Sequence, residues 1–273
     1  MLNLPNFVVL LLPGVAEIAK EHHLAGQQHD NLCGPYWVSI LLRSHGYSVT
    51  PEAIAASVGS VLPAGDPLTW LPKGGTPRQD YSFPLPTTAS LSDAGTSVYG
   101  LIETVAQVSQ GKYCLLPLQA QWTAERVTEV LHLCQTQPDW KAIPICNLRT
   151  GHLWGAGLAV EAAIAYLNSQ PIAPPPPNWN VGHFLALAGT VQGKSRSLVL
   201  VCDTYPMFGW QGYHLQSAEA IAHALNRDDG NGGGILLFVA TQHQAQVQSA
   251  FGQNFTFQAW NNGSPNGKSS YAR

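Results

Sequence analysis

A cysteine at the predicted start of a helix is the first candidate for chemistry. Cys33 is followed by Gly34 and a proline, and an apolar helical pattern then runs to about residue 44. Unpaired N–H groups and the positive dipole end of a helix N-terminus favour a thiolate over a thiol, and the thiolate is the nucleophilic form. The position therefore predicts a nucleophile at Cys33. The alternative is a buried core cysteine beside a helix cap at Asp30 or Asn31.

Side chains near this cysteine fit the other tasks of a nucleophilic site. Gln27 precedes Cys33 by six residues, so its amide and the Cys33 backbone N–H would together bind an oxyanion. The neighbouring Gln28 competes with Gln27 for that role. Gly34 allows another chain to approach closely, and Trp37 follows in the same helix. We expect both to contribute to substrate binding.

A histidine and an aspartate in the second half of the chain complete the pattern. His183 follows Gly182 and opens an apolar strand, and the next strand ends at Asp203. A hairpin turning at residues 193–197 places the two side chains opposite or diagonal to one another. The acid would then orient the imidazole and stabilise its charged form, while Gly182 leaves room for a substrate backbone. The alternative is a structural histidine and an unrelated turn aspartate.

Other histidines compete less well. His152 also follows a glycine and is the best rival for the base, but no long strand follows it. His22, His23 and His29 form a group with Cys33 that suggests a metal site, yet no carboxylate or second cysteine stands at ligand spacing. We expect surface histidines and no metal. Trp210 lies after Asp203 and is expected to line the cleft, or else to belong to the core.

The combined pattern resembles the papain-like cysteine peptidase superfamily, closest to the free-standing relatives of the bacteriocin-processing (double-glycine leader) peptidases. The similarity covers residues 27–45 and 180–206. It implies a nucleophile at Cys33, a base at His183, an orienting acid at Asp203 and an oxyanion donor at Gln27. It also implies a helical lobe carrying the cysteine, packed against an antiparallel sheet carrying histidine and acid. These relatives follow the acid directly with proline, whereas two residues intervene here.

The elements that must position these residues predict an α+β fold. Apolar periodicity, proline and glycine punctuation and cap residues predict the helices, and short apolar runs predict the strands. The expected helices are 34–44, 51–58, 97–110, one that follows Thr123 and includes 127–134, 157–168 and 217–226. The expected strands are 113–118, 142–148, 183–190, 198–204 and 235–240. Helices come mainly first and antiparallel strands afterwards, which favours one α+β domain or two lobes with a cleft between them.

The predicted domain covers residues 1–252, with a helical part at about 15–135 and a sheet part at about 140–245. A polar tail, 253–273, is expected to be disordered or to fold back on the cleft. The loop at 63–96 is long enough to suggest that it covers a site. The apolar run 7–12 lacks a preceding basic residue, which indicates a buried segment of a cytoplasmic protein rather than a secretory signal.

Charge is scarce in this sequence of 273 residues. Charged residues make up 11% and the net charge is −3, with no basic cluster, which argues against a nucleic-acid partner. No stretch reaches the length needed to cross a membrane. The five cysteines are odd in number and widely spaced, so we expect neither a disulfide scaffold nor a four-ligand zinc site. The low charge predicts a neutral or apolar substrate segment.

The leading hypothesis is a cysteine peptidase or amidase that acts on a peptide or amide substrate without a cofactor, in a role such as natural-product peptide maturation in bacteria. Cys33 attacks the carbonyl, His183 transfers the proton, and water releases the acyl group. One alternative is an acyltransferase in which an amine intercepts the same acyl-enzyme. Another is a papain-like scaffold that binds a peptide without catalysis. The sequence does not distinguish the acceptor, because water and amine would use the same three residues.

Overall fold

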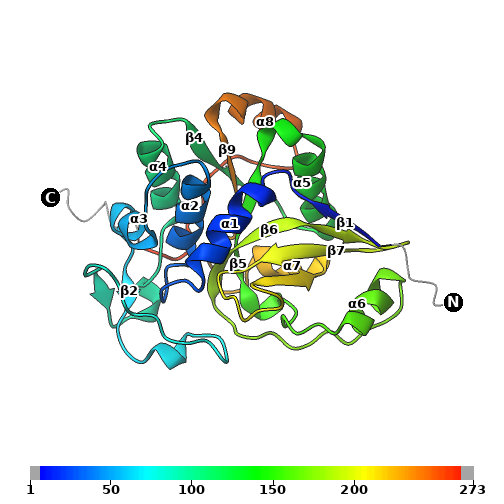
Figure 1. Cartoon of the computed structure of the whole chain (residues 1–273), viewed down its shortest axis with the longest axis horizontal. Coiled ribbons are helices and arrows are strands. Elements are labelled where there is room, and N and C mark those ends of the chain that lie inside the picture. The colour runs from blue at the N-terminus through cyan, green and yellow to red at the C-terminus, as the bar shows by residue number, and fades with distance from the viewer. Residues whose placement is uncertain (1–6, 266–273) are drawn as a thin grey trace.

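Apolar runs from both halves of the chain assemble into one antiparallel sheet. The computed structural model describes residues 7–265, and in this part of the chain the sheet has seven strands (Figure 1). The strands are β1 (Val8–Leu11), β4 (Tyr113–Leu118), β5 (Ile143–Arg149), β6 (Gly182–Gln192), β7 (Ser197–Cys202), β8 (Tyr213–Gln216) and β9 (Gly234–Ala240). Their order is β4-β9-β5-β6-β7-β8, with β1 paired to the far end of β6. A separate small parallel pair joins β2 (Leu62–Pro63) to β3 (Thr87–Thr88).

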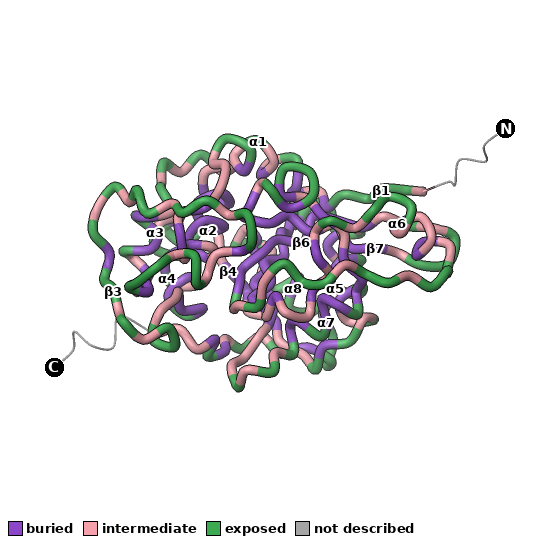
Figure 2. Tube along the Cα trace, turned by 90° about the horizontal axis from the view of Figure 1, so that it is seen from below, coloured by how far each residue is buried: buried purple, intermediate pink, exposed green. Residues whose placement is uncertain are grey.

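Helices cover both faces of this sheet (Figure 2). The helices are α1 (Val15–Ala25), α2 (Cys33–Ser44), α3 (Pro51–Val58), α4 (Val98–Val108), α5 (Ala124–Thr136), α6 (Val160–Leu167), α7 (Ala218–Asn226) and α8 (Gln244–Ala250). The α1 and α2 helices lie on one face, and α5 and α7 lie on the other. The sheet is therefore the middle of three layers, and its central strands β5 and β6 are almost wholly buried.

The α2 helix is held rigidly against the sheet. Every residue from Gly34 to Leu42 is buried, because α2 packs against β6 and is flanked by α1, α3 and α4. The indole Nε1 of Trp37 donates a hydrogen bond to the carbonyl oxygen of Phe184 in β6, at 3.1 Å. A Cβ added to Gly34 would meet Leu101 at 3.0 Å and Phe184 at 3.3 Å. The start of α2 is thus fixed relative to the start of β6.

The predicted α+β class and the main elements are confirmed. In α3, the Thr50 hydroxyl accepts from the Ala53 N–H at 3.2 Å, and Gly59 ends the helix in the left-handed region with φ 78°. The separation into a helical part and a sheet part is less complete than predicted, because β1 and β4 come from the helical half of the sequence. The α1, β8 and α8 elements had no individual prediction.

No helix in the described part of the chain has the length and apolarity needed to cross a membrane.

The apolar run near the N-terminus differs from the prediction of a buried segment. The four residues of β1 are all exposed, and only Leu12 after them is buried. They form an edge strand, and the backbone approaches β6 so closely that a Cβ on Gly189 would lie 2.2 Å from the Leu10 carbonyl oxygen. Gly189 has φ 154° and lies at a bulge in the β6–β7 pairing.

The polar C-terminal segment is packed where it is described. Phe255 and Trp260 are buried, and the Trp260 indole donates to Asn147 Oδ1 at 3.1 Å. The Asn262 side chain donates to the Thr96 carbonyl oxygen at 3.0 Å. Residues 253–265 thus fold back on the domain, the second of the two outcomes expected for this tail. The remainder of the predicted tail, 266–273, lies outside the described residues.

Candidate active site

Cys33 is the first residue of α2 and is half-buried. The residue before it, Leu32, offers no side-chain cap, so nothing on that side chain satisfies the first N–H groups of the helix. The other cysteines have different surroundings, since Cys134, Cys146 and Cys202 are fully buried in the core. Cys33 is therefore a cysteine at a helix N-terminus with access from outside, as the sequence predicts.

His183 and Asp203 meet at the ends of two neighbouring strands. The imidazole Nε2 of His183 lies 3.2 Å from Asp203 Oδ1, and both side chains are at most 3% exposed. Ala186 in β6 faces Cys202 in β7, so Asp203 continues the register opposite Leu185. His183 is two residues from Leu185 and shares its side of the strand, which makes the pair diagonal. The predicted pairing is confirmed.

The charges of this pair depend on each other and on Cys33. Burial disfavours the charged imidazole, but the Asp203 carboxylate and then Cys33, by hydrogen bond and charge, outweigh it and raise the pKa of His183 to about 10. Burial would likewise raise the pKa of Asp203, but the charge and hydrogen bond of His183 hold it well below its ordinary value. Cys33, His183 and Asp203 are thus brought together as an interacting set.

Backbone and side-chain groups fix the Asp203 carboxylate in place. Oδ1 accepts from the Tyr205 backbone N–H at 3.2 Å and from the Thr204 hydroxyl at 3.4 Å, in addition to His183. The Asp203 backbone is fixed too, because its carbonyl oxygen lies 2.9 Å from Nε2 of His22. The acid therefore has little freedom to turn away from the imidazole.

A second histidine faces the other carboxylate oxygen. His214 is buried in β8, and its Nε2 lies 3.8 Å from Asp203 Oδ2. The Gln216 amide is oriented by Trp154, since the Trp154 N–H donates to Oε1 and the Trp154 carbonyl accepts from Nε2, both at 2.8 Å. Gln216 Nε2 must then donate to His214 Nδ1, 3.1 Å away, which leaves the proton of neutral His214 on Nε2, toward Asp203.

His22 was expected on the surface, and this prediction is wrong. It is only 3% exposed and stacks on Trp37 with ring centroids 5.5 Å apart, while His23 is exposed as expected. Burial lowers the pKa of His22, with the Asp203 carbonyl opposing that effect. A neutral ring therefore fills the space between α1, α2 and Asp203. His29 is half-buried and faces Glu52 at 3.6 Å.

Of the two glutamines before Cys33, Gln28 and not the expected Gln27 is packed near His183 and Asp203. The Gln27 amide donates to the Thr76 carbonyl at 2.6 Å, in the long loop, so it is engaged outside the group of Cys33, His183 and Asp203. Gln28 is buried, its backbone N–H donates to the Thr204 carbonyl at 3.1 Å, and its amide faces the Tyr205 hydroxyl at 3.4 Å. Gln28 Oε1 has no hydrogen-bond partner among the described residues. Gln28, and not Gln27, is the glutamine packed beside the residues that hold Asp203.

A cleft of about 460 Å³ opens over Cys33. Gly182 lines it as predicted, and the 63–96 loop contributes to its wall, among others through Trp70 and Leu91. The same loop is tied to the segment before Cys33, because the Arg78 N–H donates to Asp30 Oδ1 at 3.0 Å. The loop thus forms part of the cleft wall, and that it covers a functional site stays a prediction.

Three predicted substrate contacts have other roles. Trp37 is fully buried and holds α2 to β6, so it has no surface to offer a substrate. Gly34 is also buried, and its missing side chain serves the packing of α2 against Phe184. Trp210 is 73% exposed in the turn before β8 and does not line the cleft. The aromatic rings near His183 in the described part of the chain include Trp179, edge-to-face at 5.0 Å, and Tyr205 at 6.3 Å.

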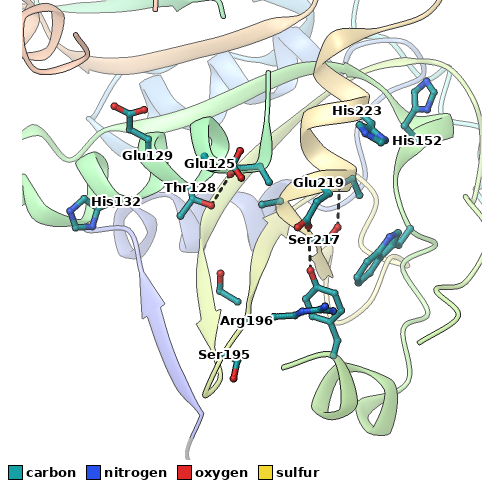
Figure 3. A pocket seen from close by; sticks show the side chains of 16 residues that line it. Glu125, Thr128, Glu129, His132, His152, Ser195, Arg196, Ser217, Glu219 and His223 are labelled. Atoms are coloured by element: carbon teal, nitrogen blue, oxygen red, sulfur yellow. Dashed lines mark hydrogen bonds between the residues drawn. The ribbon is translucent and has the colours of Figure 1, made fainter. Parts of the chain in front are cut away.

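The rival base lies in a different hollow. His152 lines a larger depression of about 950 Å³ together with residues of α5 and α7, and its Nε2 lies 3.3 Å from Asp228 (Figure 3). In Figure 3, His132 lies at one side of the hollow, with His152 and His223 at the other. Cys33 does not line this hollow. The preference for His183 over His152 is therefore supported.

Comparison with known proteins adds a family. Residues 12–261 match the model of DUF6885, a family of unknown function. The chain belongs to this family. The match includes Cys33, His183, Asp203 and Trp260, whereas residues 262–264, which also line the cleft, lie just beyond it. No curated protein matches the chain.

Three residues of this DUF6885 site escaped sequence reasoning. Tyr205 is buried beside His183, and its pKa is raised by burial and then by the charges of Cys33, Asp30 and Asp203. His214 and His22 are buried around Asp203. One signal was present for His214, which alternates with Gln216 in a short apolar run after Asp203. The spacing of Val15, Ile18 and His22 places His22, and not His23, on the buried face of α1, a signal that depends on predicting that helix.

Proposed function

We propose that the chain is a cysteine hydrolase of papain-like arrangement, acting on a peptide or amide substrate. The observation that supports this most is the set of Cys33 at a helix N-terminus, the imidazole of His183 and the buried carboxylate of Asp203. A nucleophile, a proton carrier and an orienting acid, each supplied by a different element, are the parts that acyl transfer through a thioester needs.

The ring nitrogens of His183 have separate tasks. Nε2 faces Asp203, which only accepts hydrogen bonds, so Nε2 carries a proton and Nδ1 is left for Cys33. Because the pKa of His183 is raised to about 10, the imidazole is charged at neutral pH, and a positive charge beside Cys33 favours the nucleophilic form of its sulfur. The thiolate attacks the carbonyl carbon, and His183 donates its Nδ1 proton to the leaving amine.

Hydrolysis then completes the cycle. Neutral His183 takes a proton from water as that water attacks the thioester, and the Cys33–carbon bond breaks to release the acid. The Cys33 backbone N–H binds the oxyanion at both tetrahedral stages. Gln28 is the better candidate for the second donor, because it is packed against Tyr205 beside the site while Gln27 is engaged by Thr76.

The first test is the alkylation of the five cysteines by iodoacetamide at pH 7, followed by mass spectrometry of each cysteine-containing peptide. Cys114 is the internal control because it is half-buried like Cys33, and burial raises its pKa. We expect Cys33 to react at least about tenfold faster, since a paired thiolate is far more nucleophilic than a thiol. Equal rates at Cys33 and Cys114 would exclude an activated nucleophile.

A second test separates catalysis from binding. A mixture of short peptides and peptide amides is incubated with the wild-type protein and with Cys33→Ala. We expect new amine groups only with the wild type. Products that carry an added amine in place of water would identify acyl transfer, and a product profile unchanged by Cys33→Ala would contradict the proposal.

A further inference from the structure

The cleft over Cys33 contains an unbalanced charge. Among the described residues that line it, the charged side chains besides Cys33 are Arg149, Arg227 and Asp229, two cations and one anion. A thiolate at Cys33 is balanced by the charged imidazole of His183 and leaves this count unchanged. The remaining lining side chains are neutral polar or apolar, including Asn180, Asn231 and Trp70. A chain with few charges thus carries one net positive charge in the wall of its candidate active site.

The two arginines share one carboxylate. Arg227 donates to Asp229 through Nε at 2.9 Å and NH2 at 2.5 Å, and Arg149 NH1 donates to it at 3.2 Å. The hydrogen bond from Arg227, opposed by burial, holds the pKa of Asp229 well below its ordinary value, so the carboxylate is ionised at neutral pH. Guanidinium groups keep their charge throughout. The excess of one positive charge is therefore permanent.

This charge lies at the same end of the sheet as the proposed base. Arg149 is the last residue of β5 and pairs with Gly182, while its neighbour Leu148 pairs with His183. Arg227 approaches the same point, because a Cβ placed on Gly182 would lie 3.4 Å from Arg227 NH2. Gly182 directly precedes His183 in the chain, and both arginines line the same cleft as Cys33, so a group held by these arginines would lie in the cleft that opens over Cys33.

Donor capacity remains on both side chains. Each guanidinium has five N–H donors. Each uses two of them in hydrogen bonds with described residues: Arg149 with Asn180 and Asp229, and Arg227 twice with Asp229. A planar carboxylate is already the partner here, and the fork of an arginine matches that group better than any other in a peptide. Arg227 is only 4% exposed, and a buried cation without a full counter-charge is costly.

We propose that these arginines form a carboxylate-binding subsite, so that the substrate carries an acidic group close to the bond that Cys33 attacks. The proposal rests on the hydrolase function above and names its substrate class. It replaces the neutral substrate expected from the whole-chain charge, because the local wall of the cleft and not the average surface meets the substrate. The carboxylate comes from an acidic side chain or from a free peptide C-terminus.

The test compares two alkylating probes that differ in one charge. N-bromoacetylglycine and N-bromoacetylglycinamide both alkylate a thiolate, with formation of the sulfur–carbon bond and loss of bromide. The rates at Cys33 are measured in the wild type and in Arg149→Gln, chosen because Arg227 still holds Asp229 in that variant. We expect the carboxylate probe to react about tenfold faster in the wild type, the ratio for one charge-assisted bidentate contact. In Arg149→Gln we expect the ratio of the carboxylate-probe rate to the amide-probe rate to fall toward one.

Two controls make the outcome specific. Arg196→Gln removes a positive charge from the larger hollow. We expect this variant to keep the wild-type ratio of the two probe rates at Cys33. Arg149→Lys keeps the charge without the fork and is expected to give an intermediate ratio. Equal ratios in the wild type and Arg149→Gln would overturn the subsite. Failure of both probes to label Cys33 faster than Cys114 would instead overturn the hydrolase function.

A third probe distinguishes the sources of the carboxylate. The α-amide of N-bromoacetylglutamic acid carries its carboxylate on a side chain, whereas N-bromoacetylglycine carries a terminal carboxylate. A preference for the first that is lost in Arg149→Gln identifies an acidic side chain, and a preference for the second identifies a free C-terminus. Rates for both acids no higher than for the amide would overturn the proposal.

Discussion

The hollow that contains His152 is larger than the cleft over Cys33, but the cleft over Cys33 lies beside the more strongly interacting titratable groups. The larger one, about 950 Å³, is lined by three histidines and several glutamates, yet its labelled side chains are spread around the rim (Figure 3). The smaller one, about 460 Å³, contains Cys33 next to a histidine and an aspartate that are almost completely buried. The number of titratable groups and the volume both favour the larger hollow, whereas the coupling between groups favours the smaller.

Burial explains this difference. In the larger hollow, His152 faces Asp228, whose side chain is 68% exposed, so water and salt screen the pair. His183 and Asp203 face each other away from water, where each charge strongly favours the opposite charge on its partner. A pair of that kind holds a fixed protonation state and a fixed geometry. Strongly shifted pKa values in a cleft are therefore better markers of chemistry than cleft volume.

The largest effect is expected when the histidine of each hollow is removed. In His183→Ala the iodoacetamide rate at Cys33 falls about 10- to 100-fold at pH 6, because no imidazolium stabilises the thiolate. In His152→Ala the rate stays within about twofold, the spread expected of a change away from the reacting group. Mass spectrometry of the Cys33 peptide measures both, and circular dichroism checks that each variant is folded. Equal losses in the two variants would contradict the assignment of the base.

The two aspartates provide the next largest contrast, in stability. Asp203→Asn is expected to lower the free energy of unfolding by about 3 kcal/mol or more, because it breaks a buried ion pair and leaves its partner without a counter-charge. Asp228→Asn removes an exposed partner and is expected to cost about 0–1 kcal/mol. Urea unfolding of the three proteins at pH 6 measures the difference. Similar costs for the two changes would show that burial does not separate the hollows.

The pH dependence of that contrast has a defined sign. His183 has a raised pKa, so its contribution to stability is complete below pH 6.5 and disappears as the pH rises through about 10. Asp203 has a lowered pKa, so its contribution is complete above pH 3.8 and disappears as the pH falls. The stability difference between wild type and Asp203→Asn is therefore largest between pH 3.8 and pH 6.5 and shrinks from pH 7 to pH 9. Urea unfolding at pH 5, 7 and 9 tests this, and a difference that grows with pH would contradict it.

The sequence predicts those parts of the fold and site that depend on short-range patterns of residues. The start of α2 at Cys33, the capped α3 helix and the β6–β7 hairpin follow from punctuation and periodicity, and the hairpin alone predicts that His183 meets Asp203. Cys202 faces Ala186, so Asp203 comes opposite Leu185, two residues from His183, and a separation of two keeps both side chains on one side of the sheet. Local order therefore yielded the three central residues of the site.

The remainder of the site depends on packing between distant segments, which periodicity does not encode. Gln27 and Gln28 differ by one position, and only the path of the chain past Thr204 decides which of them is turned inward. Trp37 looked like a wall of the cleft because it lies near Cys33 in sequence, but one helical turn moves it into the core. The arginine pair joins the end of β5 to the loop after α7, which no motif connects.

The smallest effect is expected at His214, which faces Asp203 from the side away from His183. His214→Phe keeps a ring against Phe208 but removes the Nε2 proton that points to the Asp203 carboxylate. The Asp203 carboxylate then loses the N–H group that faces Oδ2 and interacts more strongly with His183, so we expect the pKa of His183 to rise above its wild-type value and the alkylation rate at Cys33 to change by no more than about threefold, as for one weak polar contact. Titration of the His183 ring by NMR measures the first change directly. The matched variant in the other hollow, His223→Phe, replaces an exposed ring and should leave the titration unchanged. A wild-type titration of His183 in His214→Phe would mean that His214 only fills space, because a ring of similar size then suffices.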